Sequence, residues 1–272
     1  MNIRRWSVGV LAAALFVPGL AACNSSADEP AAGKASAAPV VPADPKEALL
    51  AATKEISKGN FTFTIADADT SGGGKVHLPS KSAEMKVAST NTDGEDFSVD
   101  MHLVFTETDS WVKLDFTGSI ADMFPELKDR KGKYQHLDRT KIKGAKDLEF
   151  DFADVDPAGT EALTKAVTDV KKTGEGTYGG TLDATKVTGS DLLDESTVEG
   201  LAGKASALPF TAKLDAQGRL TEFAVQVPAV GEDKAHEVKV NYADYGAATA
   251  VQQPPANNVV EAPDDIYKMF KD

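Results

Sequence analysis

Apolar and polar residues alternate over much of the chain after residue 60. Phe61, Phe63 and Ile65 alternate with threonine residues, and large apolar side chains occupy every second position of the segment 97–105. A period of two is typical of strands that have one face in a core and the other in water. The same alternation recurs at 76–78, 85–87, 112–116, 177–182, 210–214, 223–227 and 238–242. The chain therefore predicts an antiparallel sheet with one apolar face.

Helices are predicted before two groups of these strands. The segment 44–47 reads Asp-Pro-Lys-Glu, the residue order that begins helices, and Gly59 marks the end of the first helix. A second helix is predicted to begin at 156–157, Asp-Pro, and to end at Gly174. Its apolar face would consist of Leu163, Val167 and Val170.

Turn-forming residues separate the predicted strands. Ser71-Gly72-Gly73-Gly74 is interpreted as a turn, as is the segment 215–218. Pro254-Pro255 interrupts the chain before a final helix at 265–270.

A faint internal repeat accompanies this pattern. The segment 137–144 reads Leu-Asp-Arg-Thr-Lys-Ile-Lys-Gly, and 182–189 reads Leu-Asp-Ala-Thr-Lys-Val-Thr-Gly. One interpretation is a domain of two related halves, 44–150 and 156–246, followed by a C-terminal tail. The other is that this residue order simply suits the end of a strand.

The N-terminal segment is typical of a secretory signal. Arg4 and Arg5 precede a short apolar run, which ends in Leu20-Ala21-Ala22-Cys23. This ending resembles the lipobox of bacterial lipoproteins. The resemblance implies that residues 1–22 are a signal peptide and that Cys23 becomes the lipidated first residue of the mature chain. The alternative is an ordinary signal peptide with a chance cysteine.

Residues 23–43 are predicted to be the lipidated cysteine and a flexible spacer. Seven alanines, three prolines and three serines occur in 24–43, without an aromatic residue, so the segment cannot bury enough apolar surface to fold. A single domain, 44–272, is expected to follow. Acylated Cys23 would hold this domain on the outer face of the cytoplasmic membrane, which makes the membrane a partner of the chain.

Composition narrows the classes of function. The formal net charge of −13 argues against nucleic acid as a partner. The single cysteine excludes an intrachain disulfide and a cysteine zinc cluster. No spacing of histidines or carboxylates indicates a metal site; the acidic pairs near 93–96 and at 264–265 would bind calcium weakly or be solvated. We therefore expect no cofactor, no metal and no enzymatic activity.

His102 and Trp111 lie at polar positions of the predicted strands. His102 is expected to be solvated. Trp111 is expected at an edge or opening of the sheet, where a ligand or partner could reach it.

Several segments in order resemble the LprG/LppX-type actinobacterial cell-envelope lipoproteins. They are 179–183, 214–220, 238–246 and 254–260, and the likeness covers about residues 44–262. It implies an α+β fold, with a strongly curved antiparallel sheet, a half-barrel, and helices on its concave face, similar to the lipoprotein carrier and receptor group. It also implies an apolar cavity for an acylated lipid or glycolipid, with a membrane transporter as a candidate partner, and offers no catalytic residues to transfer.

The hypothesis from sequence is therefore an envelope lipoprotein that binds a hydrophobic ligand for carriage or presentation. The alternative is a structural or protein-interaction lipoprotein with a filled core. The candidate ligand-binding residues are the apolar strand positions Phe61, Phe63, Ile65, Met85, Val87, Phe97, Val99, Met101, Leu103, Phe105, Val112, Leu114, Phe116, Phe210, Leu214, Phe223 and Val225.

Overall fold

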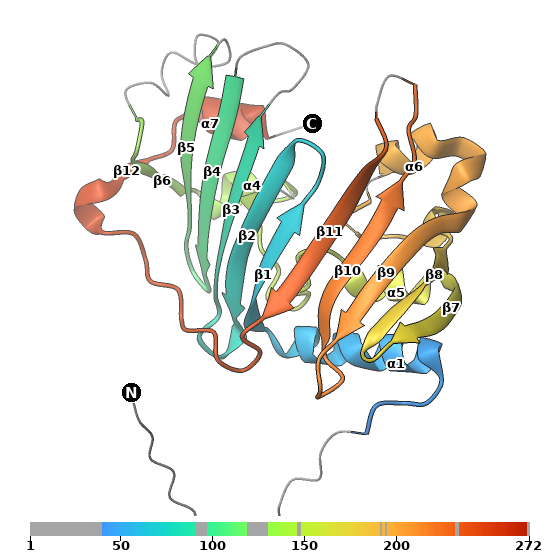
Figure 1. The fold of residues 1–272 in the computed structure, drawn as a ribbon. Helices are drawn as coiled ribbons and strands as arrows, with labels where there is room; N and C mark the ends of the chain where they lie inside the picture. The colour runs from blue at the N-terminus through green and yellow to red at the C-terminus, as the bar shows by residue number, and fades with distance from the viewer. Residues whose placement is uncertain are drawn as a thin grey trace, which may run out of the picture. The chain divides into compact units, whose positions relative to one another are not determined.

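One sheet contains all twelve strands, in the order β12-β6-β5-β4-β3-β2-β1-β11-β10-β9-β8-β7 (Figure 1). The computed structural model describes residues 40–90, 97–118, 130–145, 148–190, 192–193, 195–231 and 234–270. All neighbouring strands are antiparallel except β12 and β6, which are parallel. The sheet is not closed into a barrel.

The two parts of the chain join at the middle of this sheet, where β1 pairs with β11. The first part forms α1 (Pro45–Ala52), β1 (Asn60–Ala66), β2 (Thr70–His77), β3 (Ser82–Thr90), β4 (Phe97–Thr106), β5 (Ser110–Gly118), β6 (Tyr134–Leu137) and α4 (Arg139–Ile142). The second part forms α5 (Thr160–Lys165), β7 (Val167–Gly174), β8 (Thr177–Leu182), α6 (Glu195–Leu201), β9 (Leu208–Leu214), β10 (Leu220–Val227), β11 (His236–Ala243), β12 (Val259–Glu261) and α7 (Asp264–Met269). Short 3-10 helices occur at Thr53–Lys58, Leu78–Ser80, Ala184–Lys186, Ala202–Ala207 and Ala256–Asn258.

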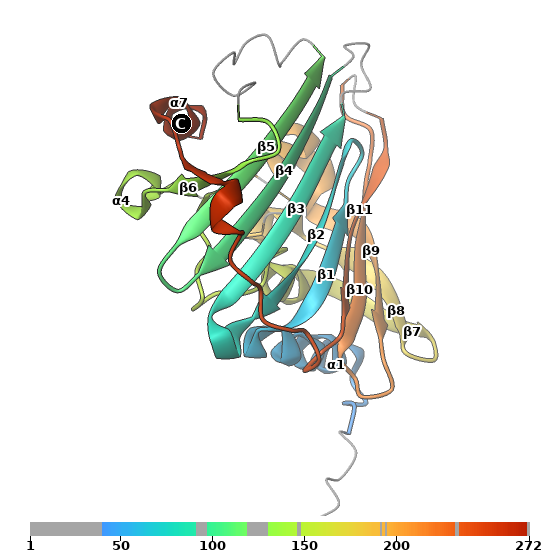
Figure 2. The ribbon, with the colours of Figure 1, turned by 90° about the vertical axis from the view of Figure 1, so that its left-hand side faces the viewer.

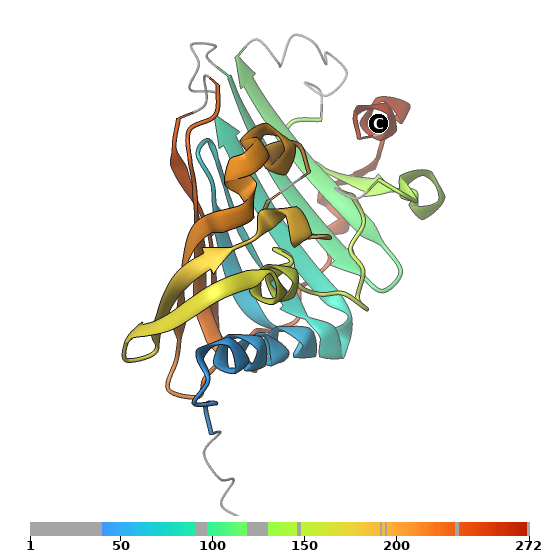
Figure 3. The same ribbon diagram turned by 90° about the vertical axis from the view of Figure 1, so that its right-hand side faces the viewer.

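Helices cover the concave face of the curved sheet. Figure 3 shows α1, α5 and α6 on this side, with α1 across one end of the strands. Leu49 of α1 and Ile56, which follows it, are almost fully buried and belong to the same apolar core as Phe61 and Phe223 of the sheet. The α+β fold with a strongly curved antiparallel sheet and helices on its concave face is therefore confirmed.

The local sequence explains both ends of the first helical segment. The Asp44 carboxylate accepts a hydrogen bond of 2.9 Å from the Glu47 backbone N–H, and Pro45 occupies the first helical position. Gly59 ends the following 3-10 turn with φ 61°, a conformation that favours glycine.

The glycine run was predicted wrongly. Gly72, Gly73 and Gly74 are not a turn but lie inside β2, between β1 and β3. A Cβ at Gly74 would lie 1.9 Å from the backbone oxygen of Glu84, and one at Gly73 would lie 2.8 Å from that of Phe63. Glycine is required here because the three backbones approach too closely for a side chain.

The second predicted helix is shorter than expected. α5 ends at Lys165, and Val167 and Val170 belong to strand β7, which pairs with β8 at one edge of the sheet. β-branched residues at 167, 168 and 170 favour the extended backbone, and this preference outweighs the helical spacing.

The C-terminal tail crosses the outer face of the sheet (Figure 2). The backbone N–H of Val251 donates to Ser82 Oγ at 2.9 Å. Val251 also packs on Val104 and Trp111, which form a small second core on this face. Trp111 is only 7% exposed, so its expected place at an open edge was wrong: the tail covers it.

Candidate functional site

The apolar face of the sheet is closed near α1. Phe61, Val76, Ala83 and Phe105 lie in register on β1 to β4 and are each at most 2% exposed. Side chains from the helices therefore fill this end of the concave face, and a ligand has no room there.

The other end of the same face is only partly covered. Ile65, Val87 and Met101 share one cross-strand row, and Val99 faces Phe116 in the next row. All five side chains are partly exposed. Burial thus decreases along the strands from the α1 end to the opposite end, which leaves a patch of partly exposed apolar side chains on the concave side of β1 to β5.

The predicted ligand-binding residues divide accordingly. Those in the closed core are Phe61, Phe63, Leu103, Phe105, Val112, Leu114, Phe210, Leu214, Phe223 and Val225. Those that are partly exposed are Ile65, Met85, Val87, Val99, Met101 and Phe116. Phe97 is the first residue of β4. Cys23 lies outside the described residues.

The second part of the sheet offers no opening at its predicted positions. The rings of Phe210 and Phe223 stack with their centres 5.2 Å apart, and Val225 lies opposite Phe210 in the register. These side chains act as packed core, which corrects the expectation that they line a cavity.

A wide groove lies mainly on the other face of the sheet. It has a volume of about 900 Å³ and crosses β1 to β6. Most of its lining comes from positions that alternate with the apolar core positions: Thr62, Thr64, Ser71, Gly73, Lys75, Glu84, Lys86, Ala88, Asp100, His102, Lys113, Asp115 and Tyr134. A hollow of this volume is the size of a small-molecule site, and its lining combines charged side chains with apolar ones such as Val87 and Met101.

A chain of polar contacts crosses the floor of this groove. The Glu84 carboxylate forms an ion pair with Lys75 Nζ at 3.5 Å and contacts His102 Nε2 at 3.2 Å. The Tyr134 hydroxyl lies 2.8 Å from His102 Nδ1. These contacts join four strands, β2, β3, β4 and β6, through side chains alone.

Burial favours the neutral forms of His102 and Tyr134, the two ring side chains in this set of contacts. It lowers the pKa of His102 below 6.5, although the hydrogen bond to Glu84 acts in the opposite direction. Burial also raises the pKa of Tyr134. At pH 7 the phenol therefore donates to Nδ1 of a neutral imidazole, whose Nε2–H donates to Glu84; we assign this tautomer from the network.

His102 was thus misjudged as a solvated residue. Its side chain is 15% exposed and has partners on both ring nitrogens. The sequence placed His102 on the polar face, but not beside Glu84 and Tyr134, because alternation gives the face of a residue and not the register between strands.

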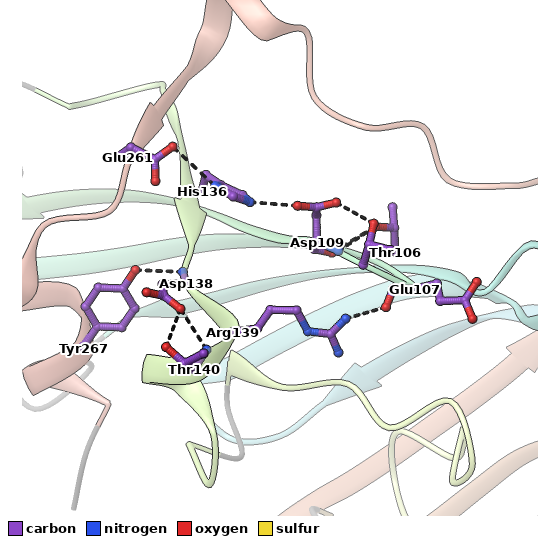
Figure 4. Close-up of polar contacts among 10 residues, drawn as sticks. Thr106, Glu107, Asp109, His136, Asp138, Arg139, Thr140, Glu261 and Tyr267 are labelled. Atoms are coloured by element: carbon purple, nitrogen blue, oxygen red, sulfur yellow. Dashed lines mark hydrogen bonds and ion pairs between the residues drawn. The ribbon is translucent and has the colours of Figure 1, made fainter.

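A second polar cluster lies at the β6 edge of the sheet (Figure 4). His136 Nε2 contacts Asp109 at 3.0 Å, and Nδ1 contacts Glu261 of β12 at 3.4 Å. The Thr108 hydroxyl lowers the pKa of Asp109, and His136 adds to this effect. His136 of β6 therefore connects the turn between β4 and β5, through Asp109, with the C-terminal strand β12, through Glu261.

Neighbouring contacts in Figure 4 have the same role. The Asp138 backbone N–H donates to the Tyr267 hydroxyl of α7 at 2.9 Å, and Arg139 donates to the Glu107 carbonyl oxygen. These bonds fix α4 and α7 beside β6.

Neither a metal cluster nor a long apolar helix occurs in the part of the chain that the structure describes. No group of three or more metal-ligating side chains is present there. Asp264 and Asp265 instead contact Lys141 and Lys268, at 2.8 and 2.9 Å. The acidic segment 93–96 lies outside the described residues. Of the described helices, none combines the length and apolar character that crossing a membrane requires.

Comparisons with known proteins give no family. No protein-family model matches the chain, and no curated protein matches it. Two solved structures are weakly similar: an inactive mutant of the CurK dehydratase, at 10% identity, and the dehydratase domain from the CurK module of the curacin polyketide synthase, at 11%. Each match covers 75% of this chain and 80% of the other, with a TM-score of 0.19.

The expectation that the chain is not an enzyme finds no support in these comparisons. Both similar structures are dehydratase domains, which are enzymes. A TM-score of 0.19 carries no argument about the fold or reaction of this chain, so the comparison assigns it no activity.

Proposed function

We propose that this chain is a lipid-anchored envelope protein that binds a hydrophobic ligand at the open end of its concave face. The ligand would be an acylated lipid or glycolipid, carried or presented at the outer face of the cytoplasmic membrane. Acylated Cys23 would provide the anchor, and a membrane transporter is a candidate partner.

The decrease of burial along the concave face is the observation that supports this function. Ile65, Val87, Val99, Met101 and Phe116 remain partly exposed, whereas the row near α1 is closed. A contiguous patch of partly exposed apolar side chains is the kind of surface on which hydrophobic ligands bind. Met85 and Met101 add side chains that adapt to ligands of different shapes.

Energetics suit exchange between such a surface and a bilayer. An acyl chain that leaves the membrane for an apolar surface keeps most of its hydrophobic stabilisation, which is about 0.8 kcal/mol per buried CH₂. Loading and unloading are then nearly balanced, as a carrier requires.

The closed end of the core favours a second candidate function, which needs no ligand. Most of the predicted lining residues are buried, including all four in the second part of the sheet. A structural or protein-interaction lipoprotein with a filled core would have this interior.

Substitution of Met101 tests the ligand site. We expect native mass spectrometry of the full chain, extracted from membranes, to show bound lipid beyond the acyl anchor. Met101→Lys should reduce that lipid at least about tenfold, because it places a charge among apolar side chains. Val170→Lys, at a half-buried position on edge strand β7, is the matched control and should keep the lipid.

Two results would count against the proposal. Absence of lipid from the wild type would favour the filled core. Undiminished lipid on a folded Met101→Lys protein would remove β4 from the site.

A further inference from the structure

The groove on the outer face has its charges arranged in cross-strand rows. Lys86, His102 and Lys113 are directly opposite one another on β3, β4 and β5. The imidazole between the two lysines is engaged by Glu84 and Tyr134. The row therefore presents one ammonium group on each side of the half-buried His102 ring.

The two lysines of this row have no anionic partner among the described side chains. Within the described ranges, neither Lys86 nor Lys113 forms an ion pair, although Lys75 of the same groove contacts Glu84. The Lys113 ammonium lies 5.5 Å from the centre of the Tyr134 ring, and Lys86 is exposed. These two cations are free to converge on a ligand anion.

The next row carries the opposite charge. Asp100 and Asp115 face each other directly on β4 and β5, two residues along each strand from His102 and Lys113. Like charges at directly opposite positions destabilise a sheet. The backbone N–H of Gly132 donates to Asp115 at 2.9 Å and satisfies only part of this carboxylate pair.

We propose that the groove binds a zwitterionic phosphate ester, with its phosphate between Lys86 and Lys113 and its ammonium group between Asp100 and Asp115. The rows are about 6.8 Å apart along the strands, so flexible side chains on both can reach the two ends of one short headgroup. An ammonium group also relieves the repulsion between the carboxylates. The groove volume of about 900 Å³ accommodates such a molecule.

This site is independent of the proposed hydrophobic site. The charged side chains of the groove alternate along β3 to β5 with the partly exposed apolar side chains and therefore point to the opposite face, although Val87 and Met101 also contribute to the groove lining. Loss of one site should therefore leave the other intact. The phosphate ester could be a phospholipid headgroup or a soluble compound, because the recognised chemistry is the same.

Titration calorimetry of the full chain tests the assignment at low salt, where screening is weak. Phosphoethanolamine should bind more tightly than inorganic phosphate or ethanolamine alone. The double variant Lys86→Gln/Lys113→Gln should bind phosphoethanolamine at least about tenfold more weakly, since two charge-assisted contacts are lost. Lys172→Gln, on β7 at the far edge of the sheet, is the matched control and should change nothing.

Asp100→Asn distinguishes the binding contribution of the ammonium group from that of the phosphate. It should weaken phosphoethanolamine binding without weakening inorganic phosphate binding. An unchanged preference for phosphoethanolamine in this variant would overturn the place of the ammonium group. Each variant should unfold in one cooperative thermal transition, which shows that the fold is retained, and Asp100→Asn should be at least as stable as the wild type because it removes one of two facing like charges.

A vesicle experiment distinguishes the two sources of the ligand. If the soluble ester does not bind, phosphatidylethanolamine vesicles should still retain more wild-type chain than double variant, which supports a lipid headgroup. Equal behaviour of the wild type and the double variant toward both the ester and the vesicles would overturn the proposal.

Discussion

His102 shows how one residue acquires its properties from its neighbours in the sheet. It lies opposite Lys86 and Lys113, while Glu84 and Tyr134 bind its two ring nitrogens. Burial lowers its pKa, Glu84 raises it, and the two lysines lower it. These opposing effects can be tested one at a time.

NMR titration of the imidazole should give a midpoint below 6.5 for His102. Glu84→Gln should lower the midpoint further, because it removes the carboxylate that favours the charged ring, and Lys86→Gln should raise it. A midpoint at or above 6.5, or shifts of the opposite signs, would contradict this account.

The same pKa shift makes stability depend on pH. Between the pKa of the folded state and 6.5, the unfolded chain binds more protons than the folded chain at His102. The free energy of unfolding therefore falls as the pH drops through this window. His102→Gln should flatten that part of the pH profile.

At the level of single residues, the sequence predicts the aspartates that end strands well. The repeated Leu-Asp-x-Thr segments both end a strand, β6 or β8. Asp138 and Asp183 each accept from the backbone N–H and the hydroxyl of the threonine two residues later. The repeat is thus a local strand ending, found at two different places in the strand order.

At the scale of elements, β2 depends on glycine. Its neighbours β1 and β3 approach so closely that Gly72, Gly73 and Gly74 leave no space for a Cβ. Sequence reasoning assigned these residues to a turn, since close approach of backbones depends on strands that are distant in the sequence.

Gly74→Ala should therefore destabilise the fold. We expect the free energy of unfolding to drop by about 1–3 kcal/mol or more, because the added carbon collides with the Glu84 backbone. Gly203→Ala is a suitable control, as nothing lies within 4 Å of its added carbon. Urea denaturation measures both. Equal stability of the two variants would refute the packing argument.

Alternation predicted most strands but not their partners. Phe61, Met101 and Phe223 were correctly placed on the apolar face, because a period of two fixes the face of each residue. The groove was missed, since only the register brings Lys86, His102 and Lys113 together. β7 was missed as well, because helical spacing and β-branched residues coincide around Val167 and Val170.

At the scale of the whole molecule, the curved sheet and its covering helices agree with the prediction from sequence. Whether the interior is filled or hollow could not be predicted in the same way. Periodicity cannot distinguish a filled core from an open cavity, because both need the same apolar side chains. The helices decide the outcome: they close the end near Phe61 and leave Met101 and Phe116 partly exposed.

The proposed anchor is a further property of the whole chain. Cys23→Ala should release the protein into the medium or leave its precursor unprocessed, because no thiol is available for acylation. Cell fractionation with intact-mass measurement checks this, with Ser26→Ala as the control in the predicted spacer. Normal processing and firm membrane retention of Cys23→Ala would contradict the anchor.

The pairing of β1 with β11 has a consequence for biosynthesis. The Thr62 hydroxyl donates to Asp244 across 182 residues of sequence, so the edge of β1 that faces away from β2 meets its partner β11 only when almost the whole polypeptide has been made. Until then, the unpaired peptide groups of β1 are available to other nascent chains. Truncation before His236 would make that exposure permanent, and the truncated chains should aggregate rather than accumulate as folded fragments.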